Sequence, residues 1–221
     1  MSLPLRYDDD REILKSGTLP GFGLLTKPFV WVVFNLTFIS FYQHILLLLI
    51  VSPSLVAFSA VKMSNKCADV LMQTDGLNNF DYIATFLMLT FILLESVADK
   101  QQYVFQTEKY RKKRELENLS GDFAAGFCRS GLFSIVRKPN YACEQMIWVS
   151  YYFFSVAAFP RYLVNWSICG CLLLILLFQG SGWMTELHSS KKYPDYSEYQ
   201  RRVPLFFPTI VPYFREKTKL S

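Results

Sequence analysis

The chain has 221 residues and a formal net charge of +5, and 52% of its residues are hydrophobic while only 19% are charged. An average soluble domain has roughly 45–50% apolar and about 25% charged residues, so the composition favours a membrane protein only modestly. The five cysteines include no CxxC pair, and two histidines cannot assemble a zinc site alone, so no metal is expected. The cations flank apolar segments without the interleaved aromatics of a nucleic-acid platform, so no nucleic-acid partner is expected.

Residues 1–27 are expected to form a cytoplasmic N-terminal segment. Met1 to Gly17 contain four acidic and three basic residues and no early apolar stretch. This pattern is neither a secretory signal peptide nor an Arg-rich transit peptide.

Charge-free runs predict the membrane spans. Residues 28–61 and 162–185 contain no Asp, Glu, Lys or Arg, and two shorter apolar runs cover 82–94 and 145–160. A bilayer core needs roughly 20 apolar residues at about 1.5 Å each. We therefore expect an all-α integral membrane protein, a bundle of about four transmembrane helices formed by residues 28–221. The predicted spans are approximately 28–52, 80–98, 141–160 and 162–185, followed by a tail at 186–221.

The positions of the cations predict the orientation of these spans. Lysine and arginine are concentrated between the second and third spans and in the tail after the fourth. Such segments usually face the cytoplasm. Four spans with both termini cytoplasmic satisfy this rule.

Three of the predicted helices have polar faces near their cytoplasmic ends. Residues three or four apart share a helix face, and ionisable residues in a span tend to face the bundle interior or a wet cavity. The residues on these faces are Glu95, Asp99, Gln102 and Gln106; Asn140, Glu144, Trp148 and Tyr151; and Gln179, Trp183 and Glu186. Their common depth predicts a cytoplasmic-side polar pocket. Taken singly, they also fit ion-paired helix ends and an interfacial aromatic belt.

The first span has a weaker polar stripe that includes Gln43 and His44. One interpretation is that these two residues line a substrate cavity. The other is that His44 is a hydrogen-bonded interior residue, as Ser, Thr and His often are in membrane helices.

Several segments resemble one known family. Residues 131–144, GLFSIVRKPNYACE, resemble the G-L-W-x-x-S-R-H-P-N-Y-x-G-E signature of the steroid 5-alpha-reductase-like C-terminal domain. Glu95 with residues 98–102 resembles the family's preceding helix, and residues 193–203 followed by Phe206 to Pro208 resemble its closing motif. The likeness runs from residue 34 onward and is greatest to a branch of uncharacterised membrane proteins with FQGS, here residues 178–181. Distant relatives include the sterol reductases and the isoprenylcysteine carboxyl methyltransferases.

The resemblance implies a helical membrane fold whose cytoplasmic half binds NADPH, or S-adenosylmethionine in the methyltransferases. Its implied cofactor-binding residues, together with Gln102 and Lys138, are Asp99, Arg137, Asn140, Glu186, Tyr196, Tyr199 and Arg202, with Tyr141 and Glu144 beside them. Two positions depart from the signature, because Lys138 replaces histidine and Cys143 replaces glycine. Lysine keeps a positive charge but does not titrate near neutral pH as histidine does. The cysteine side chain narrows the space in which glycine would let a helix or a cofactor come close.

Three functions follow as expectations. The first is an NADPH-dependent reductase of a lipid or steroid-like carbon–carbon double bond, with Glu144 or Tyr141 supporting proton transfer and Gln43, His44 and Glu95 contacting the lipid substrate. The second is a catalytically degenerate structural subunit, without a cofactor, of a membrane complex with other membrane subunits. The third is a lipid or prenylcysteine methyltransferase using S-adenosylmethionine. The family's usual location is the endoplasmic reticulum membrane, and the mitochondrial inner membrane is the alternative.

Overall fold

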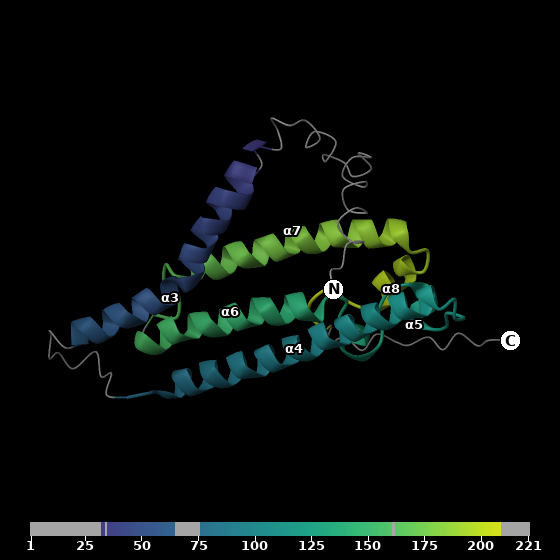
Figure 1. Ribbon diagram of the computed structural model, residues 1–221. Helices are drawn as coiled ribbons and strands as arrows, with labels where there is room; N and C mark the ends of the chain where they lie inside the picture. The colour runs from purple at the N-terminus through teal and green to yellow at the C-terminus, as the bar shows by residue number, and fades with distance from the viewer. Residues whose placement is uncertain (1–31, 34, 65–75, 161, 209–221) are drawn as a thin grey trace. The chain divides into compact units, whose positions relative to one another are not determined.

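The computed structural model describes residues 32–33, 35–64, 76–160 and 162–208, and every regular element within these ranges is a helix (Figure 1). The all-α prediction agrees with this. The chain divides into two compact units, residues 1–49 and 50–221, and each is described by itself. The predicted N-terminal segment and the end of the tail, from residue 209, lie outside the described residues.

Three helical segments are long and apolar enough to cross a membrane, judged by length and composition: Ser40–Ala60, Asn79–Arg114 and Ile168–Lys192. They correspond to the first, second and fourth predicted spans. The third predicted span, 141–160, is helical as α6 (Pro139–Ala158) but is not among these candidates. The described residues therefore support three candidate spans, and the predicted bundle of four is not established.

The first predicted span continues past residue 52. A π-helical segment, η2 (Asn35–Tyr42), leads into α3 (Gln43–Ser64), which contains Pro53. Several hydroxyl groups on α3 bond to carbonyls of their own helix, such as Ser54 to Val51 and Ser59 to Leu55, both at 2.7 Å. Such bonds satisfy hydroxyl groups without a partner helix.

The second span begins where predicted but continues far beyond residue 98. Helix α4 (Asn79–Arg114) starts with a capping box, in which the side chains of Asn78 and Asp81 satisfy each other's backbone N–H groups. Its 36 residues extend about 54 Å, well beyond a hydrocarbon core of about 30 Å. The first half exposes large apolar side chains, including Tyr82, Phe86, Leu89 and Leu93. This face suits lipid.

Helix α6 lies between α4 and α7 (Ile168–Lys192) and contacts both (Figure 1). Ten of its 20 residues are buried, against four of 36 in α4. On α6 the small residues Cys143, Ser150 and Ala157 recur every seven positions and are buried, which allows close helix contact. Since neighbouring helices cover α6, it tolerates polar residues that a lipid-exposed helix would not.

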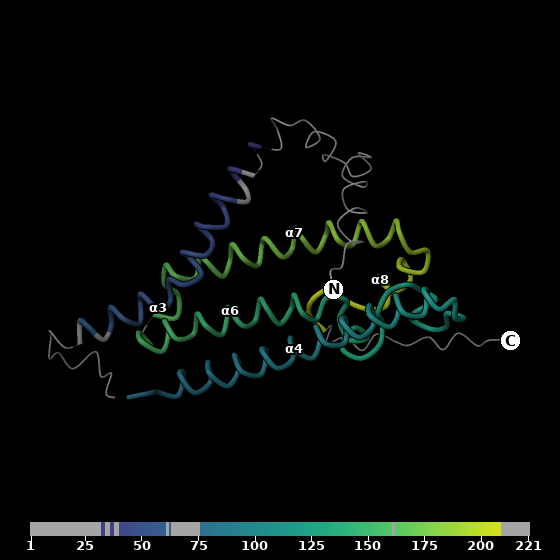
Figure 2. The backbone as a smooth tube through the Cα atoms, viewed as in Figure 1, coloured from purple at the N-terminus to yellow at the C-terminus, as the bar shows by residue number. Residues whose placement is uncertain are grey.

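Helix α7 starts six residues later than the predicted fourth span. Asn165 occupies the turn that precedes it, and its side chain accepts hydrogen bonds from the backbone N–H and the hydroxyl group of Ser167 at 3.0 and 2.6 Å. These bonds favour a turn over a helix at 162–167. Figure 2 traces the backbone from α7 through the short helix α8 (Tyr196–Arg202) and back toward the start of α6.

Candidate cofactor and substrate site

Two carboxyl side chains meet between α4 and α6. The Glu95 carboxyl group lies close to that of Glu144, and Asp99, one turn further along α4, interacts electrostatically with Glu95. Trp148 Nε1 donates to Glu144 Oε1 at 2.8 Å, because residues four apart share a helix face. Two carboxyl groups this close repel each other when both are charged, which favours a state in which the pair keeps one proton.

A tight turn precedes α6 and is held by α4 and α8. The 3₁₀-helix η3 (Gly131–Ser134) begins at Gly131 with φ +62°, a conformation that favours glycine. Leu132 N–H donates to Gln101 Oε1 at 3.0 Å, and the Tyr199 hydroxyl donates to the Phe133 carbonyl. Gly131 also lies so close to Gln101 that an added Cβ would be 2.6 Å from Oε1. These contacts position the segment that leads to Arg137.

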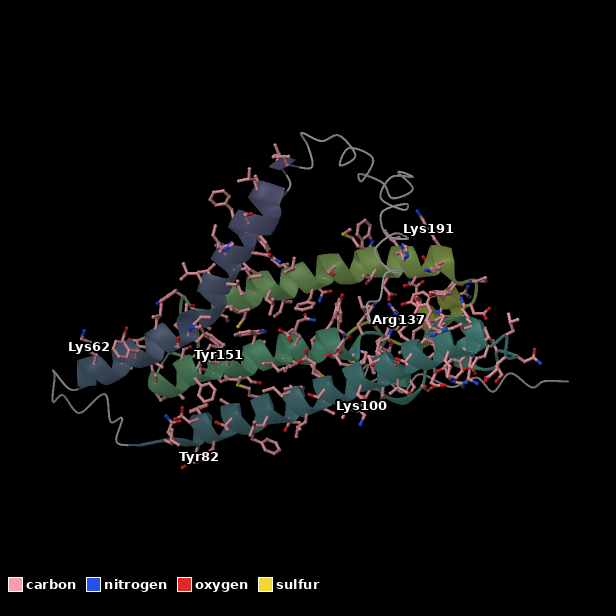
Figure 3. The ribbon with its side chains drawn as sticks, in the orientation of Figure 1. Lys62, Tyr82, Lys100, Arg137, Tyr151 and Lys191 are labelled. Carbon is pink, nitrogen blue, oxygen red and sulfur yellow. The ribbon has the colours of Figure 1, made fainter. Side chains whose placement is uncertain are left out.

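Arg137 and Glu186 form a nearly buried ion pair. Their side chains are 12% and 8% exposed, and Arg137 Nε lies 2.9 Å from Glu186 Oε2, as an ion pair rather than a hydrogen bond. Arg137 Nη1 donates to the carbonyls of Gln200, at 2.8 Å, and Val203. Figure 3 labels Arg137 near the start of α6, at the same end of the helices as Lys191 and away from Tyr82. The ion pair thus lies where α6, α7 and α8 meet.

Glu186 also accepts hydrogen bonds from two residues of α8. The Tyr196 hydroxyl donates to Oε1 at 2.6 Å, and Gln200 Nε2 donates to Oε2 at 2.8 Å. Burial, reinforced by the Glu186 carboxylate, raises the pKa of Tyr196 well above its usual value of about 10. Tyr196 therefore remains a neutral donor at physiological pH.

The segment after α8 packs along the start of α6. The backbone N–H groups of Arg137 and Lys138 donate to the carbonyls of Pro204 and Leu205 at 2.8 and 3.0 Å. The ring centroid of Tyr141 lies 5.0 Å from that of Phe178 and 6.4 Å from that of Phe206. Tyr141 is thus one wall of an aromatic contact, and the Lys138 ammonium lies 5.7 Å from its ring centroid.

The other predicted site residues occupy varied positions. Asp99 and Arg202 are exposed, Gln102 and Asn140 are half-buried, and Arg202 forms an ion pair with Glu198. Gln43 and His44 belong to the first compact unit, where His44 Nδ1 bonds to the Ser40 carbonyl and both side chains are exposed. The structure brings Glu95, Asp99 and Glu144 together and joins Glu186 to Arg137 and Tyr196. A single cavity that contains all of them stays a prediction, as do their cofactor and substrate roles.

Two residues that were not predicted from the sequence take part in the contacts of this site. Gln200 bonds to Glu186, and its spacing of four from Tyr196 was the available signal. Gln101 holds the turn at Leu132, but its partner is 31 positions away, so spacing along one helix could not reveal it. Within the described residues, no group of three or more His, Cys, Asp or Glu side chains is arranged to hold a metal ion.

The helical architecture and the apolar helices of spanning length indicate a helical membrane protein with a polar site where α6, α7 and α8 meet. The chain belongs to the family described as "Protein of unknown function (DUF1295)", whose model matches residues 14–203. This is the steroid 5-alpha-reductase-like C-terminal domain family.

One curated relative is the uncharacterized protein C594.04c of Schizosaccharomyces pombe. It is 35% identical over 191 residues, which are 82% of this chain and 51% of the yeast protein. The chain therefore spans about half the length of the curated relative it matches. No solved structure matches the chain.

Proposed function

We propose that the protein is a membrane-embedded, NADPH-dependent reductase of a lipid or steroid-like carbon–carbon double bond. The observation that supports this best is the Glu95–Glu144 carboxyl pair, in which two acidic side chains from helices α4 and α6 lie close together. Ionisable groups are costly inside membrane proteins and usually mark functional sites. The family membership makes reduction a reasonable chemistry for such a donor.

The start of α6 fits a nucleotide phosphate. Within the part of the chain that the structure describes, no side-chain hydrogen bond caps this helix, which begins with Pro139, so its first turn offers backbone N–H groups. Uncapped helix N-termini favour anions. Lys138 adds a positive charge, and Asn140 adds an amide. Arg137 fits this role less well, because Nε and Nη1 already contact Glu186, Gln200 and Val203.

When bound, the reduced nicotinamide supplies a hydride to the β-carbon of a conjugated double bond. The chain's own contribution is the proton and the exclusion of water. Glu144, which Trp148 orients, donates the proton to the substrate, and the pair then takes up another proton, because two neighbouring carboxylates repel each other. Tyr141, packed between Phe178 and Phe206, is better placed as a wall of the site than as the acid.

A panel of cofactors and lipids tests this proposal. The purified full-length chain in lipid nanodiscs is titrated with NADPH, NADH and S-adenosylmethionine, and NADPH oxidation is followed after addition of α,β-unsaturated lipid ketones. We expect NADPH to bind and its oxidation to depend on the lipid. Binding of S-adenosylmethionine alone would instead support the methyltransferase alternative.

A second candidate function is a structural subunit of a membrane complex. The Arg137–Glu186 network supports it, because internal contacts engage residues that the family resemblance assigns to the cofactor. Lys138 and Cys143 also depart from the signature. This candidate predicts that neither nucleotide nor S-adenosylmethionine binds and that defined membrane proteins co-purify from native membranes. Reverting Lys138→His and Cys143→Gly would then test whether binding returns.

We propose the endoplasmic reticulum membrane as the location, with the mitochondrial inner membrane as the alternative and both termini in the cytoplasm. A glycosylation acceptor sequence, Asn118-Leu119-Ser120, lies in a largely exposed segment after α4. The proposed topology keeps this segment in the cytoplasm, where it stays unmodified. A glycosidase-sensitive shift in gel mobility that disappears in Asn118→Gln would place this segment in the lumen and contradict the proposed orientation.

A further inference from the structure

We infer that the Arg137–Glu186 ion pair is a clamp that fastens a C-terminal strap, residues 196–206, to the start of α6, and that exposed Arg202 on this strap recognises the 2′-phosphate of NADPH. The clamp is independent of the proposed function. The role of Arg202 rests on that function and names the residue that sets its cofactor preference. The family resemblance assigns a cofactor role to both arginines, whereas here Arg137 has a structural role and, of the two, Arg202 alone contacts the cofactor.

Both partners of the ion pair form hydrogen bonds with the strap. From the Glu186 side, Tyr196 and Gln200 donate to the two carboxylate oxygens. From the Arg137 side, Nη1 donates to the carbonyls of Gln200 and Val203, and the backbone N–H donates to Pro204. The two partners therefore contact the strap along most of its length. A ligand that claimed Arg137 would have to break these contacts.

Packing of aromatic side chains closes the same attachment. Phe206 is buried against α7 at Gly182, where an added Cβ would lie 2.7 Å from its Cζ. Phe127 lies 4.9 and 5.3 Å, between ring centroids, from Tyr196 and Tyr199. The clamp is therefore largely desolvated, and removing one charged partner leaves the other buried and uncompensated.

Arg202 differs from Arg137 in exposure and in partner. Its side chain is 59% exposed, and its partner Glu198, 61% exposed, lies on the same short helix. Exposed pairs of this kind are weak and can exchange for a stronger anion. Arg202 directly precedes Val203, whose carbonyl is bonded to Arg137, so the strap places it beside the segment that leads into α6. This position in the strap, together with its exposed partner, is the basis for assigning the 2′-phosphate to Arg202.

Hydrogen exchange of the full-length chain in nanodiscs, without nucleotide, tests the clamp. We expect Arg137→Met to increase amide exchange of residues 196–206 by tenfold or more, and Gln200→Met, a milder change, to increase it several-fold. The double variant Arg137→Met/Glu186→Met should recover part of this protection, because no unpaired charge remains. Arg202→Met, which removes the same charge from the surface, is the matched control and should leave exchange within twofold.

Nucleotide titration of the same variants tests the role of Arg202. We expect Arg202→Met to weaken NADPH binding by tenfold or more and leave NADH unchanged, while Arg137→Met weakens both by the same factor. Unchanged exchange of the strap in both Arg137→Met and Gln200→Met would overturn the clamp. Selective loss of NADPH in Arg137→Met would return the phosphate to that residue and overturn the assignment. Failure of the wild-type chain to bind either nucleotide would overturn the proposed function and the Arg202 assignment, while the exchange results would still decide the clamp.

Discussion

The two ends of the α6–α7 pair are both polar but are built differently. At the turn between the helices, the contacts are neutral and local. The Tyr152 hydroxyl donates to the Leu163 carbonyl at 2.9 Å and accepts from Asn165 N–H at 3.1 Å, and Asn165 Nδ2 donates to Ser155 Oγ at 3.0 Å. At the other end, Arg137, Glu186 and the strap join residues about 50 to 66 positions apart through charged groups.

This difference separates fold from chemistry. The neutral turn satisfies its buried hydroxyl groups completely within a few residues, which stabilises one geometry and leaves no reactive group. The charged end has a clamp and, nearby on α4 and α6, the carboxyl groups of Glu95, Asp99 and Glu144. Within the described residues no ion pair joins these three carboxyl groups to a cation, and unpaired carboxyl groups are poor stabilisers, which fits the proposed role of Glu144 as an acid.

The largest expected effect is on activity at the charged end. Glu144→Gln keeps the side chain's size and a contact with Trp148 but removes the acidic proton. Positioned acids contribute typically 10²–10⁴-fold, so we expect lipid-dependent NADPH oxidation to fall by about that factor. Nucleotide affinity should remain within about twofold of wild type, as measured by titration. Full activity in this variant would show that the carboxyl pair is structural, like the opposite turn.

The next effect is on stability at the neutral turn. Asn165→Ala removes one hydrogen bond each from the buried hydroxyls of Ser155 and Ser167 and from the Ser167 backbone N–H, while the two hydroxyls keep their bond to each other. Each lost hydrogen bond costs about 1 kcal/mol, and we expect a total loss of about 3 kcal/mol. Chemical unfolding in detergent measures this, with exposed Asn118→Ala as control. A loss of nucleotide binding in the folded variant would contradict the division between the two ends.

A smaller effect is expected from the packing of the strap against α7, where no charged group is involved. Gly182→Ala places a methyl group against Phe206, and overpacking of this kind costs about 1–3 kcal/mol. Gly180→Ala, two positions away, has open space around its Cβ and should be neutral or slightly stabilising in a helix. We expect faster hydrogen exchange of residues 196–206 in the first variant alone. Equal behaviour of the two variants would mean that Phe206 does not hold the strap.

The parts of the site that were predictable from the sequence depend on contacts within one helix. Spacing of four placed Glu95 with Asp99, and Glu144 with Trp148, because helix geometry is local. The meeting of Arg137 with Glu186 was not predictable by spacing, since the two residues are 49 positions apart and meet only because α7 packs against α6. Hydropathy placed the second span's end near residue 98, but α4 continues to Arg114 because lysine, glutamine and arginine are good helix formers. Hydropathy likewise could not foresee the Asn165 turn that delays α7.

The smallest expected effect concerns Tyr199, whose hydroxyl donates to the Phe133 carbonyl behind the strap. Burial raises the pKa of Tyr199 above the usual value of about 10, so the unfolded chain releases this proton at a lower pH than the folded chain. The Tyr199 hydroxyl therefore makes its full contribution to the free energy of unfolding below about pH 10. This contribution falls as the pH rises further, because the unfolded state then binds fewer protons than the folded state.

Tyr199→Phe loses a hydrogen bond of about 1 kcal/mol at neutral pH but also loses this alkaline dependence. We expect the variant to be less stable at pH 7 and the deficit to shrink or vanish near about pH 11. Unfolding in detergent across this range measures both curves, with Tyr82→Phe on the exposed face of α4 as the control that should follow wild type. A deficit that stays constant through about pH 11 would mean that the Tyr199 hydroxyl is open to solvent, and that the strap does not seal this end of the helices.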